Sequence, residues 1–211
     1  LERGTAMADN GDGTLTAIAP RWDGWGAGIP HDFSSIEGIA SHGDDVYVIG
    51  RSIYNGGPTG YRMAHWDGAG WSDLPLELVR GGDPAKASIA GIVADSAGNV
   101  YIAGRFDYVS GVSAINIAMW NGSSWQAVDG SVWGDPIGPN ACSPARVEAI
   151  ALDGAGNVIV GGCFRRAGDV SVASVARYTG TEWDAAFTTG IDISGYVYAI
   201  AADGDTTTGG T

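Results

Sequence analysis

Short stretches of alternating apolar and polar residues recur along the chain, separated by turns rich in Gly, Asp and Asn. In the best-defined stretch, Ala90, Ile92 and Ala94 share one face of an expected strand, and the next strand is Val100–Ala103. An alternation of two residues predicts a β-strand, whereas no long segment carries the apolar period of about 3.6 residues that marks a helix. The pattern therefore predicts an all-β fold.

These stretches belong to an internal repeat. Residues 89–104 match residues 147–162, a looser copy spans residues 36–50, and a fourth copy starts at residue 197. A tryptophan hairpin recurs out of phase with the first element, at residues 21–25, 65–71, 119–125 and 177–183. The copies start about 50 to 58 residues apart, and a period of this size is typical of repeat architectures.

Each repeat is expected to contain four antiparallel strands. Its first two strands are joined by a turn such as Asp95–Gly98, in which Asp can accept backbone N–H bonds and Gly can adopt positive φ. A polar loop leads to a third strand, 116–120, and Asn121-Gly122 is a hairpin signal into a fourth, 124–128. Four short strands per unit, with recurring Gly and aromatic residues, predict a β-propeller of four-stranded antiparallel blades.

The repeat also predicts the domain organisation. We expect a single propeller domain over residues 1–211, with complete blades at about 36–74, 89–128 and 147–186. The remaining pieces, 1–35 and 197–211, together have the length of one repeat and are expected to form or feed a composite fourth blade. Its third and fourth strands would lie near Leu15–Ala19 and Trp25–Ile29. Two alternatives stay open: two chains exchange these ends to build a larger ring, or the chain is a segment of a larger propeller.

The repeat resembles a known group of proteins. Its units are similar to those of bacterial propeller-repeat families, which read roughly Ala-hydrophobic-Asp-x-x-Gly-Asn-Val-Tyr-Val-x-Gly, and to fungal cortical-marker-like repeats, which add Ile-Ala-x-Trp-Asn-Gly-x-x-Trp. The resemblance covers about residues 15–211 and is best at 89–128 and 147–186. It implies a secreted or surface-attached propeller without known catalysis, and it specifies no binding residue. The copy at 36–50 departs from the pattern, with Gly43-Asp-Asp45 in place of Gly-Asn.

Composition narrows the function classes. Of the 211 residues 45% are hydrophobic, which argues against a disordered chain. The formal charge of −13 argues against nucleic acid as a partner, because few cations are present to neutralise phosphates. No apolar run approaches the roughly 18 residues of a membrane span. The first residues, Leu1–Gly4, lack the features of a signal peptide, so an exported protein would be present here in its mature form. We expect an extracellular or cell-surface location.

The two cysteines are placed so that they can pair. Cys142 precedes the strand that begins near Val147, and Cys163 follows the strand 158–162. These strands form a hairpin, so both cysteines lie at the same rim, and a Cys142–Cys163 disulfide is expected. The alternative is two buried free thiols in a chain from a reducing compartment.

No catalytic set is apparent, and we expect no enzyme and no cofactor. The histidines His31, His42 and His65 have no metal-ligand spacing. The turns at Asp95 and Asp153, and residues 9–13, could offer oxygens to calcium. However, each repeat turn has only one carboxylate, so turn capping is the favoured interpretation and no metal site is assigned.

Tryptophan is the main functional lead. Trp71, Trp125 and Trp183 occupy equivalent positions at blade edges and are candidate ligand-binding residues, although equivalence in every blade is also what packing requires. Trp133 lies outside the repeat in a loop, where exposed aromatic residues often bind ligands. We expect a non-enzymatic extracellular scaffold that binds protein partners or self-associates through its terminal half-blades. The alternative is a lectin-like propeller that binds glycans through Trp side chains.

Overall fold

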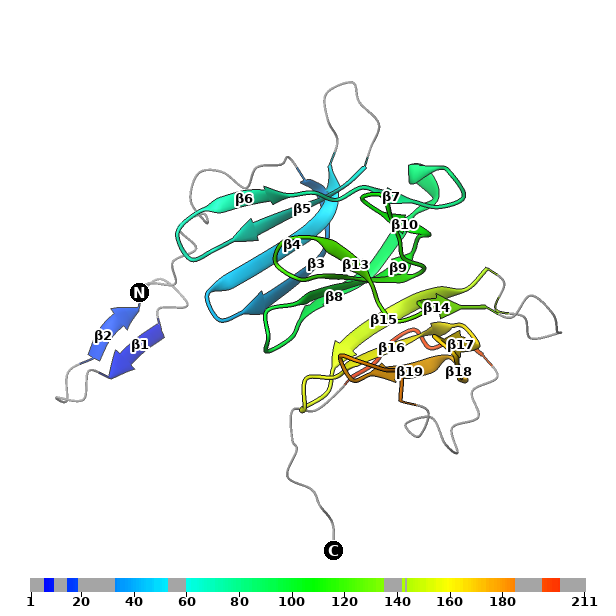
Figure 1. The fold of residues 1–211 in the computed structure, drawn as a ribbon. Coiled ribbons are helices and arrows are strands. Elements are labelled where there is room, and N and C mark those ends of the chain that lie inside the picture. The colour runs from blue at the N-terminus through cyan, green and yellow to red at the C-terminus, as the bar shows by residue number, and fades with distance from the viewer. Residues whose placement is uncertain are drawn as a thin grey trace, which may run out of the picture.

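The computed structural model describes residues 6–9, 15–18, 33–52, 60–134, 142, 144–184 and 195–201. Over these residues the chain is built of antiparallel β-sheets and one short 3-10 helix, η1 (Pro84–Lys86), so the all-β prediction is confirmed. Three larger sheets stack face to face, and two small sheets and a separate hairpin accompany them (Figure 1). In the described ranges, no helix is long and apolar enough to cross a membrane.

The three larger sheets follow the three predicted repeats. The first sheet has the order β3 (Phe33–His42), β4 (Asp45–Ser52), β5 (Gly60–Trp66), β6 (Trp71–Leu74). The second sheet has the order β8 (Ser88–Ala94), β9 (Val100–Arg105), β12 (Ile117–Trp120), β13 (Trp125–Ala127). The third sheet has the order β15 (Arg146–Leu152), β16 (Val158–Cys163), β19 (Val175–Tyr178). In the third sheet an isolated bridge between Tyr178 and Trp183 takes the place of the fourth strand.

Two small sheets lie where the sequence predicts only polar loops. One has the order β11 (Val112–Ser113), β10 (Tyr108–Val109), β7 (Leu78–Val79), and the other has the order β14 (Val132–Trp133), β17 (Arg166–Ala167), β18 (Val170–Ser171). In both, a hairpin between the second and third strands of a larger sheet pairs with the segment that precedes that sheet. Strands of two residues are too short to show an alternating pattern, which is why the sequence does not reveal them.

The first strand of each larger sheet contains a β-bulge at the same place. The register shifts between Ile36 and Gly38, between Ile89 and Gly91, and between Val147 and Ala149. The extra residue reverses the alternation, so residues three positions apart, such as Ile89 and Ile92, point to the same face. We call these two residues the apolar pair of a repeat: Ile36 and Ile39, Ile89 and Ile92, Val147 and Ile150.

The bulge also explains a recurring glycine on the second strand. A Cβ added at Gly104 would lie 2.1 Å from the carbonyl oxygen of Ser88 on the bulged strand. Gly50 and Gly162 face the same kind of contact. The strand expected from the sequence, Val100–Ala103, stops before Gly104, but the structure places all three glycines inside strands, where close backbone approach excludes a side chain.

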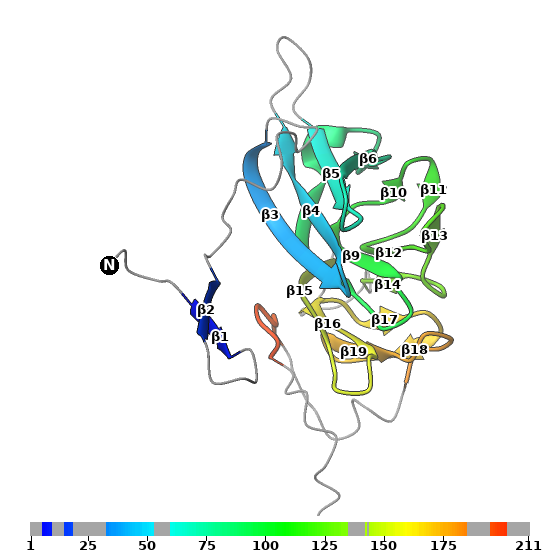
Figure 2. The same ribbon diagram turned by 90° about the vertical axis from the view of Figure 1, so that its left-hand side faces the viewer.

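The sheets pack through these apolar pairs. Strand β8 lies between β3 and β15, so the first strands of the three sheets are neighbours (Figure 1; Figure 2 shows the same stack from the side). The side chain of Ile92 lies over Gly38, with Cγ2 2.7 Å from the place of an added Cβ, and Ile150 lies over Gly91 in the same way at 2.9 Å. Ile89 and Ile92 are therefore 9% and 7% exposed.

The first sheet is different because no described segment covers the outer face of β3. Its apolar pair, Ile36 and Ile39, is 53% and 59% exposed. The stack of three sheets thus has one apolar edge that faces solvent.

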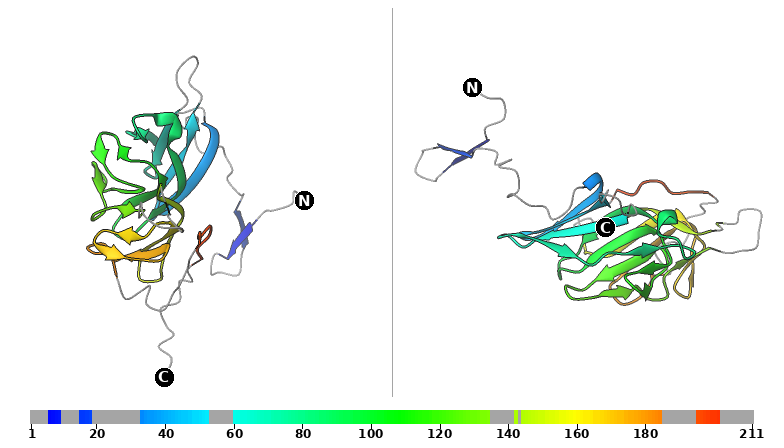
Figure 3. Two further views of the ribbon diagram at one scale, coloured as in Figure 1. Left: turned by 90° about the vertical axis from the view of Figure 1, so that its right-hand side faces the viewer. Right: turned by 90° about the horizontal axis from the view of Figure 1, so that it is seen from above.

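The first and the last segments that the structure describes lie apart from each other. Strand β2 (Leu15–Ile18) pairs with β1 (Ala6–Asp9), a strand that the sequence analysis did not expect, and this hairpin lies away from the three sheets (Figure 3). Residues 195–201 run along the third sheet without forming a sheet strand. The predicted strand 25–29 and the segment 202–211 lie outside the described residues, and the composite fourth blade stays a prediction.

Candidate binding site around Trp133

Each larger sheet carries an aromatic pair across its last two strands or, in the third sheet, across the Tyr178–Trp183 bridge. The pairs are Trp66 with Trp71, Trp120 with Trp125, and Tyr178 with Trp183, with ring centroids 5.7, 5.6 and 5.3 Å apart. The rings are tilted by 54° to 58°, an arrangement in which the edge of one ring approaches the face of the other. The pairs are thus part of the packing of the sheets.

Two of these tryptophans also bind the preceding repeat. The Nε1 of Trp125 donates to the carbonyl oxygen of Pro75 at 2.6 Å, and the Nε1 of Trp183 donates to that of Asp129 at 2.7 Å. Pro75 directly follows the first sheet, and Asp129 lies just after the second. These hydrogen bonds fasten each sheet to the one before it.

The predicted ligand-binding tryptophans therefore occupy different environments. Trp125 and Trp183 are each 5% exposed, so their rings do not face solvent, and Trp71 is half-buried. Trp133 is the exception at 44% exposed. Trp22 and Trp25 lie outside the described residues.

Trp133 is held by the small sheet that precedes β15. It lies directly opposite Arg166 in the β14–β17 ladder, and its carbonyl oxygen accepts a 2.9 Å hydrogen bond from Arg165 N. Its indole Nε1 donates to the carbonyl oxygen of Gly130, which fixes the ring orientation. The exposed part of the Trp133 side chain is therefore an aromatic surface held in one orientation.

A shallow, open depression of about 310 Å³ lies beside this ring. The residues that line it are Gly130, Trp133, Gly134, Arg166, Gly168 and Asp169. Gly130 and Gly168 approach so closely that a Cβ on Gly130 would lie 2.6 Å from the Cα of Gly168. The site therefore combines a glycine backbone, one aromatic face, one guanidinium and one carboxylate, a set that can stack on and hydrogen-bond a small polar ligand.

The sequence points to Trp133 but gives no local signal at Arg166 and Asp169. Both lie on the β17–β18 hairpin, whose counterpart in the preceding repeat is β10–β11. In that counterpart Tyr108 stands where the third repeat has Arg166. Aligning the polar loops as well as the strands could have exposed this change.

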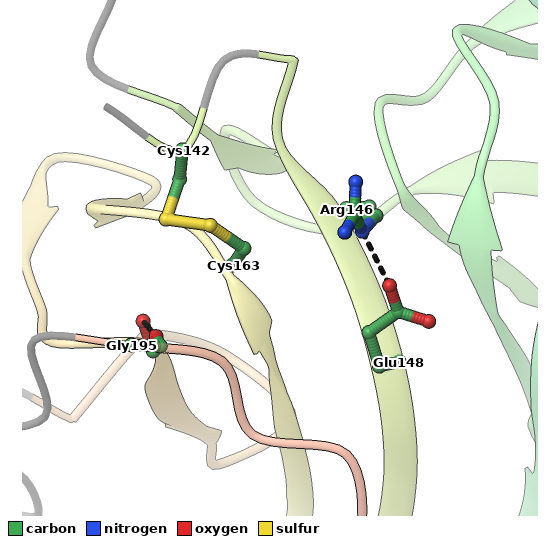
Figure 4. Close-up of a disulfide and its surroundings, with 6 residues drawn as sticks. Cys142, Arg146, Glu148, Cys163 and Gly195 are labelled. Carbon is green, nitrogen blue, oxygen red and sulfur yellow. Dashed lines mark hydrogen bonds and ion pairs between the residues drawn. A yellow bond between two sulfur atoms is a disulfide. The ribbon is translucent and has the colours of Figure 1, made fainter. Parts of the chain in front are cut away.

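A disulfide between Cys142 and Cys163 lies next to the depression, as predicted. The sulfur atoms are 2.01 Å apart, and the bond joins the segment before β15 to the end of β16 (Figure 4). A Cβ on Gly134 would lie 1.9 Å from the carbonyl oxygen of Cys142, so the residue after Trp133 packs on the bridged backbone. The covalent link thus restrains one wall of the site.

The repeat turns at Asp95 and Asp153 are capped by their carboxylates. Asp153 Oδ1 accepts from Ala155 N at 3.0 Å and from Asn157 N at 2.9 Å, and Oδ2 accepts from the Asn157 side chain at 2.9 Å. Asp95 makes the same three bonds in its own turn. These acceptors serve the turn, as the sequence analysis favoured. In the described parts of the chain, no three His, Cys, Asp or Glu residues gather as metal ligands.

Burial, hydrogen bonds and nearby charges change the pKa values of two side chains in these turns. Burial by itself would raise the pKa of the Asp153 carboxyl, but the hydrogen bonds from Asn157 and Ala155 and the charge of Arg177 lower it overall. In the neighbouring turn, burial and the nearby Asp95 carboxylate raise the pKa of Tyr101, which stays protonated and donates to Asp95 Oδ2 at 3.3 Å.

His65 packs within the first sheet. Its ring stacks on Tyr47 with centroids 4.5 Å apart, and its Nε2 lies 2.6 Å from Asp45 Oδ1. These neighbours orient the imidazole as part of the sheet surface.

Comparison with protein-family models finds no matching family, and comparison with curated protein sequences finds no match either.

Proposed function

We propose that the chain is built as a β-propeller whose ring is open at β3: each larger sheet is one blade, and residues 195–201 begin a fourth. Three features support this proposal. The sheets are antiparallel, their first strands are neighbours, and their last aromatic side chains bind the preceding repeat. The sequence resemblance to propeller-repeat families points the same way.

Within this fold, the function that we propose is that of a non-enzymatic extracellular scaffold, a module that binds other proteins. The observation that carries it is the exposed apolar pair on β3, Ile36 and Ile39, whose counterparts in the next repeat are buried between sheets. An exposed apolar edge of this kind is a candidate protein-binding surface, since folded proteins seldom leave a strand face of two isoleucines open to water. The Cys142–Cys163 disulfide supports an oxidising, extracellular environment.

Thermal unfolding of two matched variants tests whether this edge is free for a partner. Ile39→Ser should leave the Tm of the dilute protein within about 1 °C, because the side chain is exposed. Ile92→Ser, at the equivalent buried position, should lower the Tm by about 6 °C or more. If Ile39→Ser destabilises the protein as much as Ile92→Ser, the edge is covered within the chain and the proposal is wrong.

A second candidate function is carbohydrate binding at the Trp133 depression. The specific observation is that the one well-exposed tryptophan of the described residues lies beside a cation and a carboxylate, Arg166 and Asp169. Sugar rings offer apolar faces for stacking and hydroxyl groups for charged partners.

A glycan array followed by fluorescence titration with the best glycan tests this candidate. Trp133→Ala should abolish binding, and Arg166→Ala should weaken it about tenfold or more. Tyr198→Ala is the control, since Tyr198 is an exposed aromatic residue away from the depression. Binding that survives Trp133→Ala, or no binding to any glycan on the array, would exclude the candidate.

A further inference from the structure

The same contact is made at every junction that the structure describes between one repeat and the next. The apolar pair of the later repeat lies against a glycine of the earlier sheet: Ile92 over Gly38, and Ile150 over Gly91. These glycines follow the bulge, on the face opposite to the apolar pair of their own strand. Each repeat thus has an inserting side, which carries its apolar pair, and an opposite receiving side, on which the apolar pair of the next repeat packs.

Residues 195–201 extend this rule to a fourth repeat. Val197 and Ile200 have the spacing of an apolar pair, and both lie over Gly161, with Cγ1 and Cδ1 2.6 and 2.8 Å from the place of an added Cβ. Gly161 lies opposite Ala149, the third-sheet counterpart of Gly38 and Gly91. The third sheet is therefore already covered on its receiving side.

Polar contacts fix this segment on the third sheet. Val197 N donates to the Gly162 carbonyl at 3.0 Å, and the Ser174 hydroxyl donates to the Gly195 carbonyl at 2.8 Å. The Arg146 guanidinium lies over the Tyr196 ring, 4.8 Å from its centroid. The segment is thus bound on one side and leaves its other side open.

That open side has the composition of a receiving side. In the repeat alignment Ala199 occupies the position of Gly38 and Gly91, and Ala199 is exposed. At the other end of the same molecule, the inserting pair Ile36 and Ile39 is exposed as well. Both halves of one more junction are present, and within the molecule they do not cover each other.

We propose that the two halves meet between molecules: the apolar pair of β3 docks on the Ala199 side of residues 195–201 in a second copy of this chain. This inference rests on the proposed function, because it names the partner of the exposed edge. The contact is head-to-tail, with different surfaces on the two copies, and such contacts close into a ring or continue as a filament.

Site-directed crosslinking tests the contact directly. Two single variants, Ile39→Cys and Ala199→Cys, are mixed in equal amounts and treated with a short bismaleimide, while Cys142 and Cys163 stay protected in their disulfide. We expect a covalent dimer of one copy of each variant, identified by peptide mass mapping. Ser72→Cys, an exposed position on β6, replaces Ile39→Cys in the control mixture and should give no such dimer.

Sedimentation velocity gives the second readout. Ile39→Asp should weaken self-association at least tenfold, because a carboxylate cannot be buried against Ala199 without a partner. The inference is overturned if Ile39→Asp associates as the unchanged protein does, if the mixed variants give no dimer, or if the double variant Ile39→Cys/Ala199→Cys forms only a link within one chain.

These outcomes separate the two proposals. If Ile39→Ser leaves the Tm unchanged but no mixed dimer forms, the edge is free and its partner is another molecule, so only the second-copy inference fails. If Ile39→Ser lowers the Tm as Ile92→Ser does, the edge is covered within the chain and both proposals fail.

Discussion

At the scale of single residues, glycine has two different roles in this protein. In turns such as the one at Gly98, φ is 82° and glycine supplies a backbone conformation that other residues avoid. Opposite the bulges, as at Gly104, glycine is required because the neighbouring strand leaves no space for a side chain. The second role follows from long-range packing and is invisible in the local sequence.

Substitution by alanine should separate close packing from a mere loss of glycine. Gly104→Ala should reduce the free energy of unfolding by about 3 kcal/mol, because the new Cβ would collide with the backbone carbonyl of Ser88. Gly70→Ala is the matched control: an added Cβ there has no atom within 4 Å, and the change should stay within about 0.5 kcal/mol. Urea denaturation measures both. Equal effects of the two substitutions would contradict the steric argument.

The lowered pKa of Asp153 makes stability depend on pH. The unfolded Asp has a pKa of about 3.9, and the folded value is lower, so the folded state binds fewer protons in this range. The stabilisation is complete above the unfolded pKa and is lost as the pH falls through the folded value. Asp153→Asn should therefore lower the Tm near neutral pH and flatten its decline below about pH 4. A variant that keeps the full acid-induced decline would show that Asp153 does not contribute to it.

At the scale of elements, the sequence predicts the strands well where two periods are visible at once. The alternation of apolar residues and the repeated Asp and Gly turns together locate the hairpins β8–β9 and β15–β16. The turn chemistry is also predictable, because Asp95 and Asp153 bond to backbone groups only a few residues away. The small sheets could not be predicted, since they form when a short hairpin meets a segment from before the sheet.

The candidate site also combines features that the local sequence predicts with features that depend on long-range strand pairing. The Cys142–Cys163 pair follows from the expected hairpin. The expectation that Trp133 lies in a loop outside the repeat is wrong, because the structure places it on β14, the counterpart of β7, at the position that Val79 occupies in the preceding repeat. Arg166 and Asp169 are ordinary loop residues in the sequence. They become relevant only because β14 pairs with β17 and brings them next to the tryptophan.

The disulfide should stabilise the third repeat. It closes a loop with a sequence separation of 21, for which chain entropy in the unfolded state predicts about 3 kcal/mol. The double variant Cys142→Ser/Cys163→Ser should lose about this amount in urea denaturation. A loss well below 1 kcal/mol would mean that the unfolded chain is already compact in this region.

At the scale of the whole molecule, the sequence predicts the repeating unit but not what the first and last units pack against. The repeat accounts for three stacked sheets, yet the choice between closure within one chain and association of two chains depends on which surfaces meet. The same apolar pair occurs four times in the sequence, and only its location distinguishes the copies that pack on the preceding sheet from the exposed one.

The formal charge of −13 has a consequence for the folded state as a whole. Like charges repel more strongly in the compact state than in the unfolded chain, and salt screens this repulsion. Raising NaCl from about 10 to about 300 mM at neutral pH should increase the Tm by about 2 to 4 °C. A fall in Tm would indicate that ion pairs, such as Arg177 with Asp153, contribute more than the overall repulsion.

The uniform junction between repeats also bears on how such a chain can change over generations. Because each unit inserts an apolar pair on one side and offers a glycine or alanine on the other, duplicating or deleting one whole unit leaves two surfaces that still fit. A single unequal recombination can therefore alter the number of units without creating a mismatch in the interior. The surfaces at the two ends keep their character whatever that number is, so the contact that we propose between two copies does not depend on the number of units.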